Sequence, residues 1–216
     1  MTYAAALFDL AGPLLDPLSA PADAPTHART TVGRPTYPRD AYNTFLGQGV
    51  RQLFIDALGP DHQHLVDDAI AAHLGYYEDH RFDTTRPYPG IDDMLVALAE
   101  RGVKLGVLSN KPDDATQDVI ARYFPSAPWA WVRGHRIGTA PKPDPHAAIE
   151  AIDTLGIPAE RWLYVGDTAV DMQTGKGAGM FTVGVTWGFR KEDELRANGA
   201  DAIVHQPAEL IALLEK

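Results

Sequence analysis

The sequence predicts an α/β fold, in which a doubly wound parallel sheet carries a small helical domain inserted after the first strand. Short apolar runs recur along the chain, and each is followed by a loop rich in Gly, Asp, Asn or Pro. Stretches with helical spacing lie between these runs, and this alternation is typical of parallel strands covered by helices on both faces. Residues 16–86 interrupt the alternation, because they contain helical segments and no convincing strand.

The core elements follow one another in a regular order. Strands are expected at residues 4–8, 105–108, 162–165 and 181–185, with a weaker strand at 202–204. The helices between them are expected at residues 91–101, 115–123 and 145–155. In a sheet of this Rossmann-like type, ligands bind beyond the carboxyl ends of the strands. Three strand ends carry polar residues, namely Asp9, the pair Ser109 and Asn110, and Asp167.

The insertion divides the chain into a core of residues 1–15 and 87–216 and a helical cap of residues 16–86. The clearest cap helices are expected at residues 49–58 and 64–79. Two prolines and a glycine within residues 86–90 mark the return to the core. Because the insert leaves the chain directly after the first strand and its loop, it is expected to cover the mouth of the sheet like a lid.

A proline recurs at every fourth residue from the first loop into this insert, at Pro13, Pro17, Pro21 and Pro25. An interior proline costs a helix about 3 kcal/mol, because its nitrogen cannot donate and its ring meets the preceding turn. We therefore expect either that the first cap helix begins late, near Thr26, or that the segment is extended or mobile.

The composition excludes several classes of function. The 216 residues carry a net charge of −10, from 19 Lys and Arg against 29 Asp and Glu, so neither a nucleic-acid nor a membrane partner is expected. The absence of cysteine excludes disulfides, thiolate nucleophiles and cysteine-bound zinc. No apolar run is long enough to span a membrane, and the N-terminus lacks the basic segment of a signal peptide. A cytoplasmic location is therefore expected.

Carboxylates at the strand ends supply the first candidate chemistry. Asp9 follows an apolar strand and precedes Gly12, where the backbone can approach a ligand closely. Asp167 and Asp171 lie four residues apart after another buried strand, so both can point into one site if a helix begins near Asp171. Clustered carboxylates repel one another unless a cation or proton intervenes, which indicates a hard divalent metal. The alternative is that these residues are ordinary turn and helix-capping aspartates.

Two other segments are candidates for binding an anion. Ser109 and Asn110 offer a hydroxyl, an amide and backbone N–H groups at a strand end, which together can bind phosphate oxygens. Lys142 lies among prolines that restrict the backbone and so aim its side chain, namely Pro141, Pro143 and Pro145. The alternatives are an ordinary cap for the first pair and a solvent-exposed surface lysine for Lys142.

Taken in order, these motifs resemble those of the haloacid dehalogenase-like superfamily of phosphohydrolases over nearly the whole chain. The order is an Asp loop, a helical insert, a Ser-Asn strand end, a lysine in Lys-Pro-Asp-Pro and a Gly-Asp-Thr-x-x-Asp segment. Within that superfamily the chain is most similar to the phosphoglycolate phosphatase subgroup. The similarity rests on residues 46–50 (Leu-Gly-Gln-Gly-Val), 109–111 (Ser-Asn-Lys), 142–145 (Lys-Pro-Asp-Pro) and 165–168 (Val-Gly-Asp-Thr).

The resemblance implies a Mg²⁺-dependent phosphomonoester hydrolase that acts on a small phosphorylated metabolite such as phosphoglycolate. A monomer or homodimer is expected. The resemblance further implies that Asp9 is the nucleophile and takes up the phosphoryl group as an aspartyl phosphate. It also implies that Ser109, Asn110 and Lys142 bind the phosphate. A carboxylate attacks a phosphate only if their repulsion is offset, and a metal together with a lysine supplies the positive charge.

The resemblance also implies the ligands of the metal. These are the carboxylates of Asp9 and Asp167 and the backbone carbonyl of Ala11, with Asp171 in support.

The first motif departs from the family pattern, which is Asp-x-Asp-Gly-Thr. Residues 9–13 read Asp-Leu-Ala-Gly-Pro in this chain, so the second Asp is replaced by Ala11 and the Thr by Pro13. In the family, the second Asp protonates the leaving oxygen and then activates water. Such a group contributes roughly 10²–10⁴-fold to the rate. The departure implies impaired turnover with phosphate and metal binding retained.

Three alternative functions follow from this departure. A catalytically inactive homologue would bind phosphate esters without hydrolysing them. A phosphonoacetaldehyde hydrolase carries Asp-x-Ala-Gly-Thr, but it needs a cap lysine for a Schiff base, and none of the six lysines lies within residues 16–86. A haloacid dehalogenase carries an aromatic residue at this position and a cap arginine, for which Arg34, Arg39 and Arg51 are candidates.

Other patterns are expected to be structural. The eight histidines show no metal-ligand set and are expected on a solvated face. Trp129 and Trp131 alternate as core or edge-strand residues do. The segment 175–179 (Gly-Lys-Gly-Ala-Gly) resembles a phosphate loop, but its position after Asp171 favours close packing of a helix.

Overall fold

The computed structural model describes residues 3–16, 20–42, 45, 49–80 and 85–214. The chain divides into two compact units. The first consists of Met1–Asp16 and Pro87–Lys216, and the second of Pro17–Arg86. Each unit has its own buried apolar cluster. None of the helices in the described ranges is long and apolar enough to cross a membrane.

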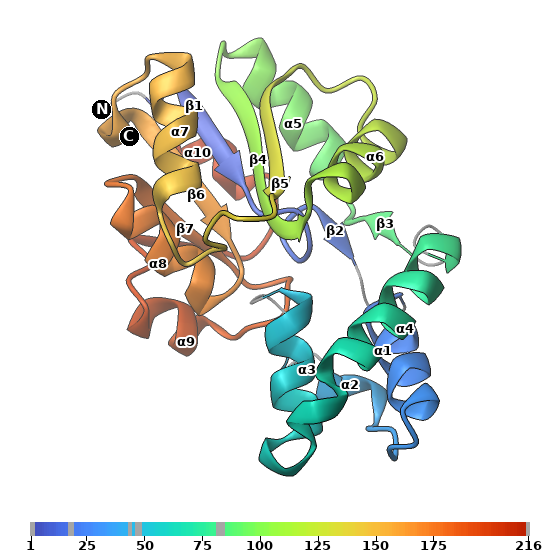
Figure 1. Cartoon of the computed structure of the whole chain (residues 1–216). Coiled ribbons are helices and arrows are strands. Elements are labelled where there is room, and N and C mark those ends of the chain that lie inside the picture. Colours follow the sequence, from blue (N-terminus) through green and yellow to red (C-terminus); the bar gives the residue numbers. More distant parts are fainter. Residues whose placement is uncertain (1–2, 17–19, 43–44, 46–48, 81–84, 215–216) are drawn as a thin grey trace. The chain divides into compact units, whose positions relative to one another are not determined.

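The first unit contains a six-stranded parallel sheet in the order β5-β4-β1-β6-β7-β8. Its strands are β1 (Ala5–Phe8), β4 (Lys104–Pro112), β5 (Trp129–His135), β6 (Trp162–Gly166), β7 (Phe181–Val185) and β8 (Ala202–Val204). Figure 1 shows β1 in the middle of this sheet, between β4 and β6. The chain first extends the sheet on one side of β1 and then returns to the other side. The carboxyl end of β1 is therefore a switch point, where doubly wound folds bind ligands.

Helices flank the sheet, and the predicted α/β fold is confirmed. They are α5 (Ile91–Glu100), α6 (Asp113–Tyr123), α7 (His146–Leu155), α8 (Ala169–Gly177), α9 (Glu192–Ala197) and α10 (Glu209–Leu213). On one face, Ala148 and Ala151 of α7 belong to the same buried apolar cluster as Leu7 of β1 and Tyr164 of β6. Every residue of β1 and β6 is buried, as expected for parallel strands covered on both faces.

One strand extends beyond its expected range, and one strand was not among those with an expected range. β4 continues through Ser109 and Asn110 to Pro112, with an irregular register between Leu108 and Pro112, so the polar pair lies within the strand instead of after it. The segment of Trp129 forms β5, which pairs with β4 alone at the edge of the sheet. The edge-strand interpretation of the two tryptophans is therefore confirmed.

The glycine-rich segment after Asp171 packs closely, as expected. A Cβ added at Gly175 in α8 would lie 2.6 Å from Thr182 Cγ2 and 2.7 Å from Tyr164 Cβ. Only a residue without a side chain lets α8 approach β6 and β7 this closely.

The second unit is helical. Its elements are α1 (Ala20–Thr31), α2 (Arg39–Tyr42), α3 (Val50–Leu58), a 3₁₀ segment η2 (Pro60–Leu65) and α4 (Val66–His80). The helices expected at 49–58 and 64–79 are thus confirmed. Their common core contains Ala28, Leu53, Phe54, Leu58, Val66 and Ala69. A short two-stranded sheet, β2 (Leu15–Asp16) and β3 (Arg86–Pro87), lies where the chain passes between the units.

The expectation of a late start for the first helix is wrong. Helix α1 begins at Ala20 and contains both Pro21 and Pro25. Pro21 falls in the first turn, where a backbone N–H has no partner inside the helix, so its missing donor costs little. Pro25 does remove an interior hydrogen bond. Ala24 and Ala28 of the same helix are buried, and their packing offsets that loss. Pro17 lies outside the described residues.

Candidate active site

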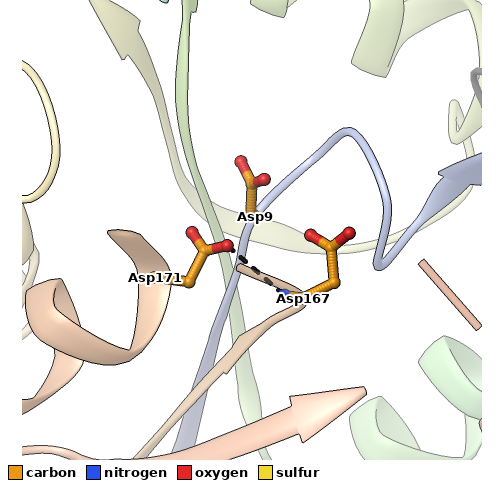
Figure 2. A group of neighbouring side chains, drawn as sticks. All are labelled: Asp9, Asp167 and Asp171. Atoms are coloured by element: carbon orange, nitrogen blue, oxygen red, sulfur yellow. Dashed lines mark hydrogen bonds between the residues drawn. The ribbon is translucent and has the colours of Figure 1, made fainter. Parts of the chain in front are cut away.

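Residues far apart in the sequence meet at the carboxyl edge of the sheet. Asp9 directly follows β1, Asp167 follows β6, and Asp171 lies in the first turn of α8. Figure 2 shows these three side chains grouped together. Each offers one carboxylate oxygen, and these oxygens all lie within 4.8 Å of one another. All three residues are buried, with Asp9 6% exposed and the other two completely enclosed.

Lys142 joins this group from the loop between β5 and α7. Its Nζ lies 2.8 Å from Asp9 Oδ1 and 2.7 Å from Asp171 Oδ1, and the residue is only 4% exposed. The surface-lysine alternative is therefore wrong. The adjacent carboxylates raise the pKa of Lys142 well above its usual value in spite of burial, which by itself lowers it. The ammonium group thus remains charged in the site.

The side chain of Asn110 holds the backbone of Lys142. The Lys142 N–H donates to Asn110 Oδ1 at 2.8 Å, and Asn110 Nδ2 donates to the Lys142 carbonyl at 3.1 Å. This pair of bonds links β4 to the lysine loop across 32 residues of sequence. Ser109 is buried beside it, and its Oγ accepts a hydrogen bond from the Lys111 N–H at 3.2 Å.

The Asp171 carboxylate contacts two different groups, the Thr168 cap of α8 and the Lys142 ammonium group. Thr168 caps α8, and Asp171 Oδ2 accepts bonds from the Thr168 N–H at 3.1 Å and from Thr168 Oγ1 at 2.7 Å. The helix-cap alternative therefore describes this carboxylate correctly, although its other oxygen binds Lys142. Asp171 thereby holds both the loop after β6 and the ammonium group.

Asp167 carries a buried oxygen that lacks a partner. Its Oδ2 accepts a hydrogen bond from the Phe189 N–H at 2.6 Å, whereas its Oδ1 has no hydrogen-bond partner among the described residues. A Cβ added at either Gly12 or Gly188 would overlap this carboxylate, so two backbones pack directly against it. Burial raises the pKa of Asp167 well above its usual value, and Asp171 and Asp9 raise it further.

This donor set fits a hard divalent cation. Mg²⁺ prefers oxygen ligands and is usually held by one or two carboxylates. The orphaned Oδ1 of Asp167 and the neighbouring carboxylate of Asp9 offer such ligands. Among the described residues, no other cluster of acidic or histidine side chains has comparable spacing, and the histidines contribute to none.

Asp9 lies between the opposing charges. Burial raises its pKa to about 6, Lys142 works in the opposite direction, and Asp171 adds to the rise. Its backbone N–H donates to the Val165 carbonyl at 2.9 Å, which holds the residue at the end of β1. At neutral pH the carboxylate is mostly ionised and able to act as a nucleophile.

The loop after Asp9 turns tightly and carries no ionisable side chain at residue 11. Gly12 has a φ of 111°, in the region that favours glycine, and its N–H donates to the Leu15 carbonyl at 3.0 Å. Ala11 is half-buried and presents only a methyl group. It cannot donate or accept a proton.

Sequence reasoning missed the loop of residues 186–190, which follows β7. Trp187 Nε1 donates to the Pro13 carbonyl at 3.0 Å, and the Phe189 N–H binds Asp167. The rule that ligands gather at carboxyl ends of strands could have pointed to this loop. The residues that make these contacts, Trp187 and Phe189, carry no charge that marks a site, and the one charged residue of the loop, Arg190, pairs with Glu194. Tyr164 was also missed; it is completely buried in β6, and its hydroxyl has no hydrogen-bond partner among the described residues.

The structure thus defines an α/β protein with an acidic site, neutralised in part by one lysine, at the switch point of its sheet. Residues 6–185 match the family described as haloacid dehalogenase-like hydrolase. The chain belongs to this family. It is a phosphatase, as the relatives described next indicate. The motif resemblance inferred from the sequence is confirmed.

Two curated relatives and one solved structure cover almost the whole chain. The phosphoglycolate phosphatase of Aquifex aeolicus is 30% identical over 97% of this chain and 95% of its own length. The N-acetylmuramic acid 6-phosphate phosphatase of Pseudomonas aeruginosa is 30% identical over 100% of this chain and 96% of its own length. A solved structure from Lactobacillus delbrueckii, described as a candidate phosphoglycolate phosphatase, has a TM-score of 0.94, 30% identity and 99% coverage of both chains.

Proposed function

We propose that this phosphatase acts on a small phosphorylated metabolite through an aspartyl phosphate on Asp9, with Mg²⁺ bound, and that its turnover is impaired at residue 11. The observation that carries the proposal is the buried ammonium group of Lys142 in contact with Asp9, next to the orphaned Oδ1 of Asp167. The ammonium group of Lys142 supports binding of an anionic substrate, and the unpartnered Asp167 oxygen supports binding of a cation. Phosphoglycolate is the leading substrate candidate, and the Aquifex aeolicus relative supports it.

The proposed chemistry begins with attack of an Asp9 carboxylate oxygen on phosphorus. The bond between phosphorus and the ester oxygen breaks, and the leaving alkoxide takes a proton from solvent water, because the methyl group of Ala11 cannot supply one. A water molecule then attacks the phosphorus of the acyl phosphate and loses a proton to solvent, while the bond to the Asp9 oxygen breaks, so that phosphate leaves and the carboxylate is restored. Lys142 neutralises the negative charge of the phosphate, while Ser109 offers its hydroxyl to a phosphate oxygen.

Mg²⁺ would be held by Asp9, the Ala11 carbonyl and Asp167, with Asp171 in support. When bound, it would draw negative charge from the phosphate in the transition state. For Asn110 we propose a positioning role in place of direct phosphate binding, because its amide bonds both backbone groups of Lys142.

Restoring the acid tests whether turnover is impaired. The Ala11→Asp variant should raise the turnover of a phosphomonoester roughly 10²–10⁴-fold, the usual contribution of a positioned acid–base group. The gain should appear in kcat, because the group acts on the leaving oxygen and on water and not on the bound ground state. Steady-state kinetics on purified wild type and variant provide the measurement.

The pattern of rescue separates the remaining alternatives. Recovery that needs both Ala11→Asp and Pro13→Thr would place part of the defect in the geometry of the first loop. No turnover in either variant, despite measurable Mg²⁺ and phosphate binding, would instead favour a protein that binds phosphate esters without hydrolysing them. A wild type as fast as its Ala11→Asp variant would contradict the impairment.

Cation binding is tested separately from activity. Mg²⁺ should bind the wild type and raise its thermal midpoint, whereas Asp167→Ala should abolish the response, because the variant lacks the orphaned oxygen. Calorimetric titration of both proteins provides the measurement. Equal responses in the two proteins would show that the cation site is wrongly placed.

The substrate class is tested with the Ala11→Asp variant on a panel of phosphomonoesters. We propose that the Pro17–Arg86 unit acts as the cap that selects among them. Small acids such as phosphoglycolate should be preferred. A preference for large sugar phosphates, the class to which the substrate named for the Pseudomonas aeruginosa relative belongs, would overturn the assignment. The cytoplasmic location and the monomeric or homodimeric state remain predictions.

A further inference from the structure

The loop of residues 186–190 contacts both segments that bear the proposed cation ligands. On one side, Trp187 Nε1 donates to the carbonyl of Pro13 at 3.0 Å, two residues after Ala11. On the other side, the Phe189 N–H donates to Asp167 Oδ2 at 2.6 Å. Gly188, between these two donors, approaches the Asp167 carboxylate so closely that a Cβ would overlap it. One short turn thus bridges the loop after β1 and the loop after β6.

These contacts decide which oxygen of Asp167 is available. The Phe189 N–H occupies Oδ2, and Oδ1 is left buried without a partner. Gly12 and Gly188 pack against the carboxylate, so neither neighbour leaves room for a side chain. The orientation of Asp167 is therefore set by backbone groups of the two loops, and it presents Oδ1 to the site.

We propose that Trp187 is a positioning residue of the cation site. Its indole N–H holds the first loop at Pro13, while the next two residues hold Asp167. The loop thereby sets the separation between the ligands contributed after β1 and the Asp167 oxygen contributed after β6. Mg²⁺ demands near-octahedral geometry with ligands at about 2.0–2.1 Å, so small displacements between the two segments weaken binding. The inference rests on the proposed function, because it assumes that the cation binds here.

The variant Trp187→Phe tests this role, because it keeps an aromatic ring and removes the N–H donor together with part of the indole ring system, a loss of ring area that the control variant shares. The matched control is Trp129→Phe, since Trp129 is also half-buried and its Nε1 donates to the Phe124 carbonyl at 3.3 Å. Mg²⁺ affinity, measured by calorimetry well below the thermal midpoints, should fall about five- to tenfold in Trp187→Phe. It should stay within about twofold of wild type in Trp129→Phe, whose indole lies on the edge strand.

A backbone variant examines the same loop without touching the indole. Gly188→Ala should weaken Mg²⁺ binding more than tenfold, because the added methyl group displaces Asp167. Its control is Gly134→Ala on β5, where a Cβ would lie 2.5 Å from Thr116 Oγ1. That control should lower the thermal midpoint and leave Mg²⁺ affinity unchanged. Unchanged affinity in Trp187→Phe, or equal losses in Trp187→Phe and Trp129→Phe, would overturn the proposal.

A measurement without metal keeps the two proposals distinguishable. Amide hydrogen exchange of the metal-free protein should be about five- to tenfold faster at Phe189 in Trp187→Phe than in wild type, and unchanged in Trp129→Phe. If wild type fails to bind Mg²⁺ while this acceleration is seen, the proposed function fails and the positioning of Asp167 by Trp187 stands. If the exchange rate at Phe189 is unchanged, the positioning role is wrong whether or not the cation binds.

Discussion

At the scale of single residues, the site is a buried group of charges that do not balance. Three carboxylates, Asp9, Asp167 and Asp171, face a single ammonium group from Lys142. The excess negative charge has a measurable consequence, because burial and mutual repulsion raise the pKa values of Asp9 and Asp167. The metal-free protein is therefore less stable when these groups are ionised.

The first prediction concerns Asp9 and pH. The pKa of Asp9 is 3.8 in the unfolded chain and about 6 in the fold, so wild-type stability falls as pH rises through this interval. The rise corresponds to about 3 kcal/mol in the free energy of unfolding. Without metal, the free energy of unfolding of Asp9→Asn relative to that of wild type should rise by up to this amount between pH 4 and pH 7. Urea unfolding at a series of pH values measures the difference.

A control variant at Asp201 should change in stability with pH in the opposite direction. The pKa of Asp201 is lowered, because hydrogen bonds from Lys176 and Thr182 outweigh the effect of burial. Asp201→Asn should therefore be less stable than wild type at pH 7, and its deficit should shrink as pH falls below 4. If the stabilities of Asp9→Asn and Asp201→Asn, each relative to wild type, change with pH in the same direction, the assigned charge state of Asp9 is wrong.

The second prediction concerns Asn110. Because its amide bonds the backbone of Lys142, Asn110→Ala should weaken binding of phosphate or vanadate about tenfold and leave Mg²⁺ affinity unchanged. Asn110→Asp retains the acceptor for the Lys142 N–H but puts an oxygen against the Lys142 carbonyl in place of the Nδ2 donor, so it should recover only part of the phosphate affinity lost in Asn110→Ala. If Asn110 contacts phosphate directly, the added carboxylate would repel the anion, and Asn110→Asp would be the weaker binder. Calorimetric titration with both variants distinguishes these outcomes.

At the scale of elements, close backbone approach determines how the helices lie on the sheet. Gly175 lets α8 approach Thr182 in β7 and Tyr164 in β6. The same helix begins with the Thr168 cap that orients Asp171. The packing of α8 and the position of a site residue are thus coupled within one element.

The third prediction compares two helical glycines. Gly175→Ala should lower the free energy of unfolding by about 1–3 kcal/mol, because the methyl group overpacks the interface. Gly75 in α4 has open space at its Cβ, with nothing within 4 Å. Gly75→Ala should therefore stabilise the protein by up to about 1 kcal/mol through helix propensity alone. Chemical denaturation of both variants measures the contrast, and equal effects would contradict the packing argument.

At the scale of the whole molecule, every residue of the candidate site belongs to one of the two units. The ligands and the lysine all lie in Met1–Asp16 and Pro87–Lys216. The unit Pro17–Arg86 has a separate apolar core around Phe54. Stability of the second unit and cation binding in the first are therefore expected to be separable.

The fourth prediction compares two fully buried phenylalanines. Phe54→Ala should destabilise the protein by about 3–5 kcal/mol and leave Mg²⁺ affinity unchanged below the unfolding transition. Phe8→Ala, one residue before Asp9 and 1% exposed, should lower both stability and Mg²⁺ affinity. Thermal unfolding and calorimetry on both variants provide the test. A loss of Mg²⁺ affinity in Phe54→Ala equal to that in Phe8→Ala would show that the two properties are not separable.

The sequence by itself determined the core strands, most helices and the carboxylates of the site. Alternation of apolar runs with helical spacing is local, and parallel strands necessarily bring their carboxyl ends to one edge, so Asp9 and Asp167 could be placed together. The cap at Thr168 and Asp171 is likewise a short-range pattern. Tertiary structure alone decided that α1 runs through Pro25, because its packing outweighs the local penalty of proline.

Tertiary structure also decided which groups meet inside the site. Lys142 reaches Asp171 across 29 residues, Asn110 binds the Lys142 backbone across 32, and Trp187 binds Pro13 across 174. Sequence patterns repeat every two residues in a strand and every three to four residues in a helix, so they describe neighbours within one element. They carry no information on contacts between residues this far apart in the sequence. The distances between these groups follow from how loops pack at the end of the sheet, and only the folded chain defines them.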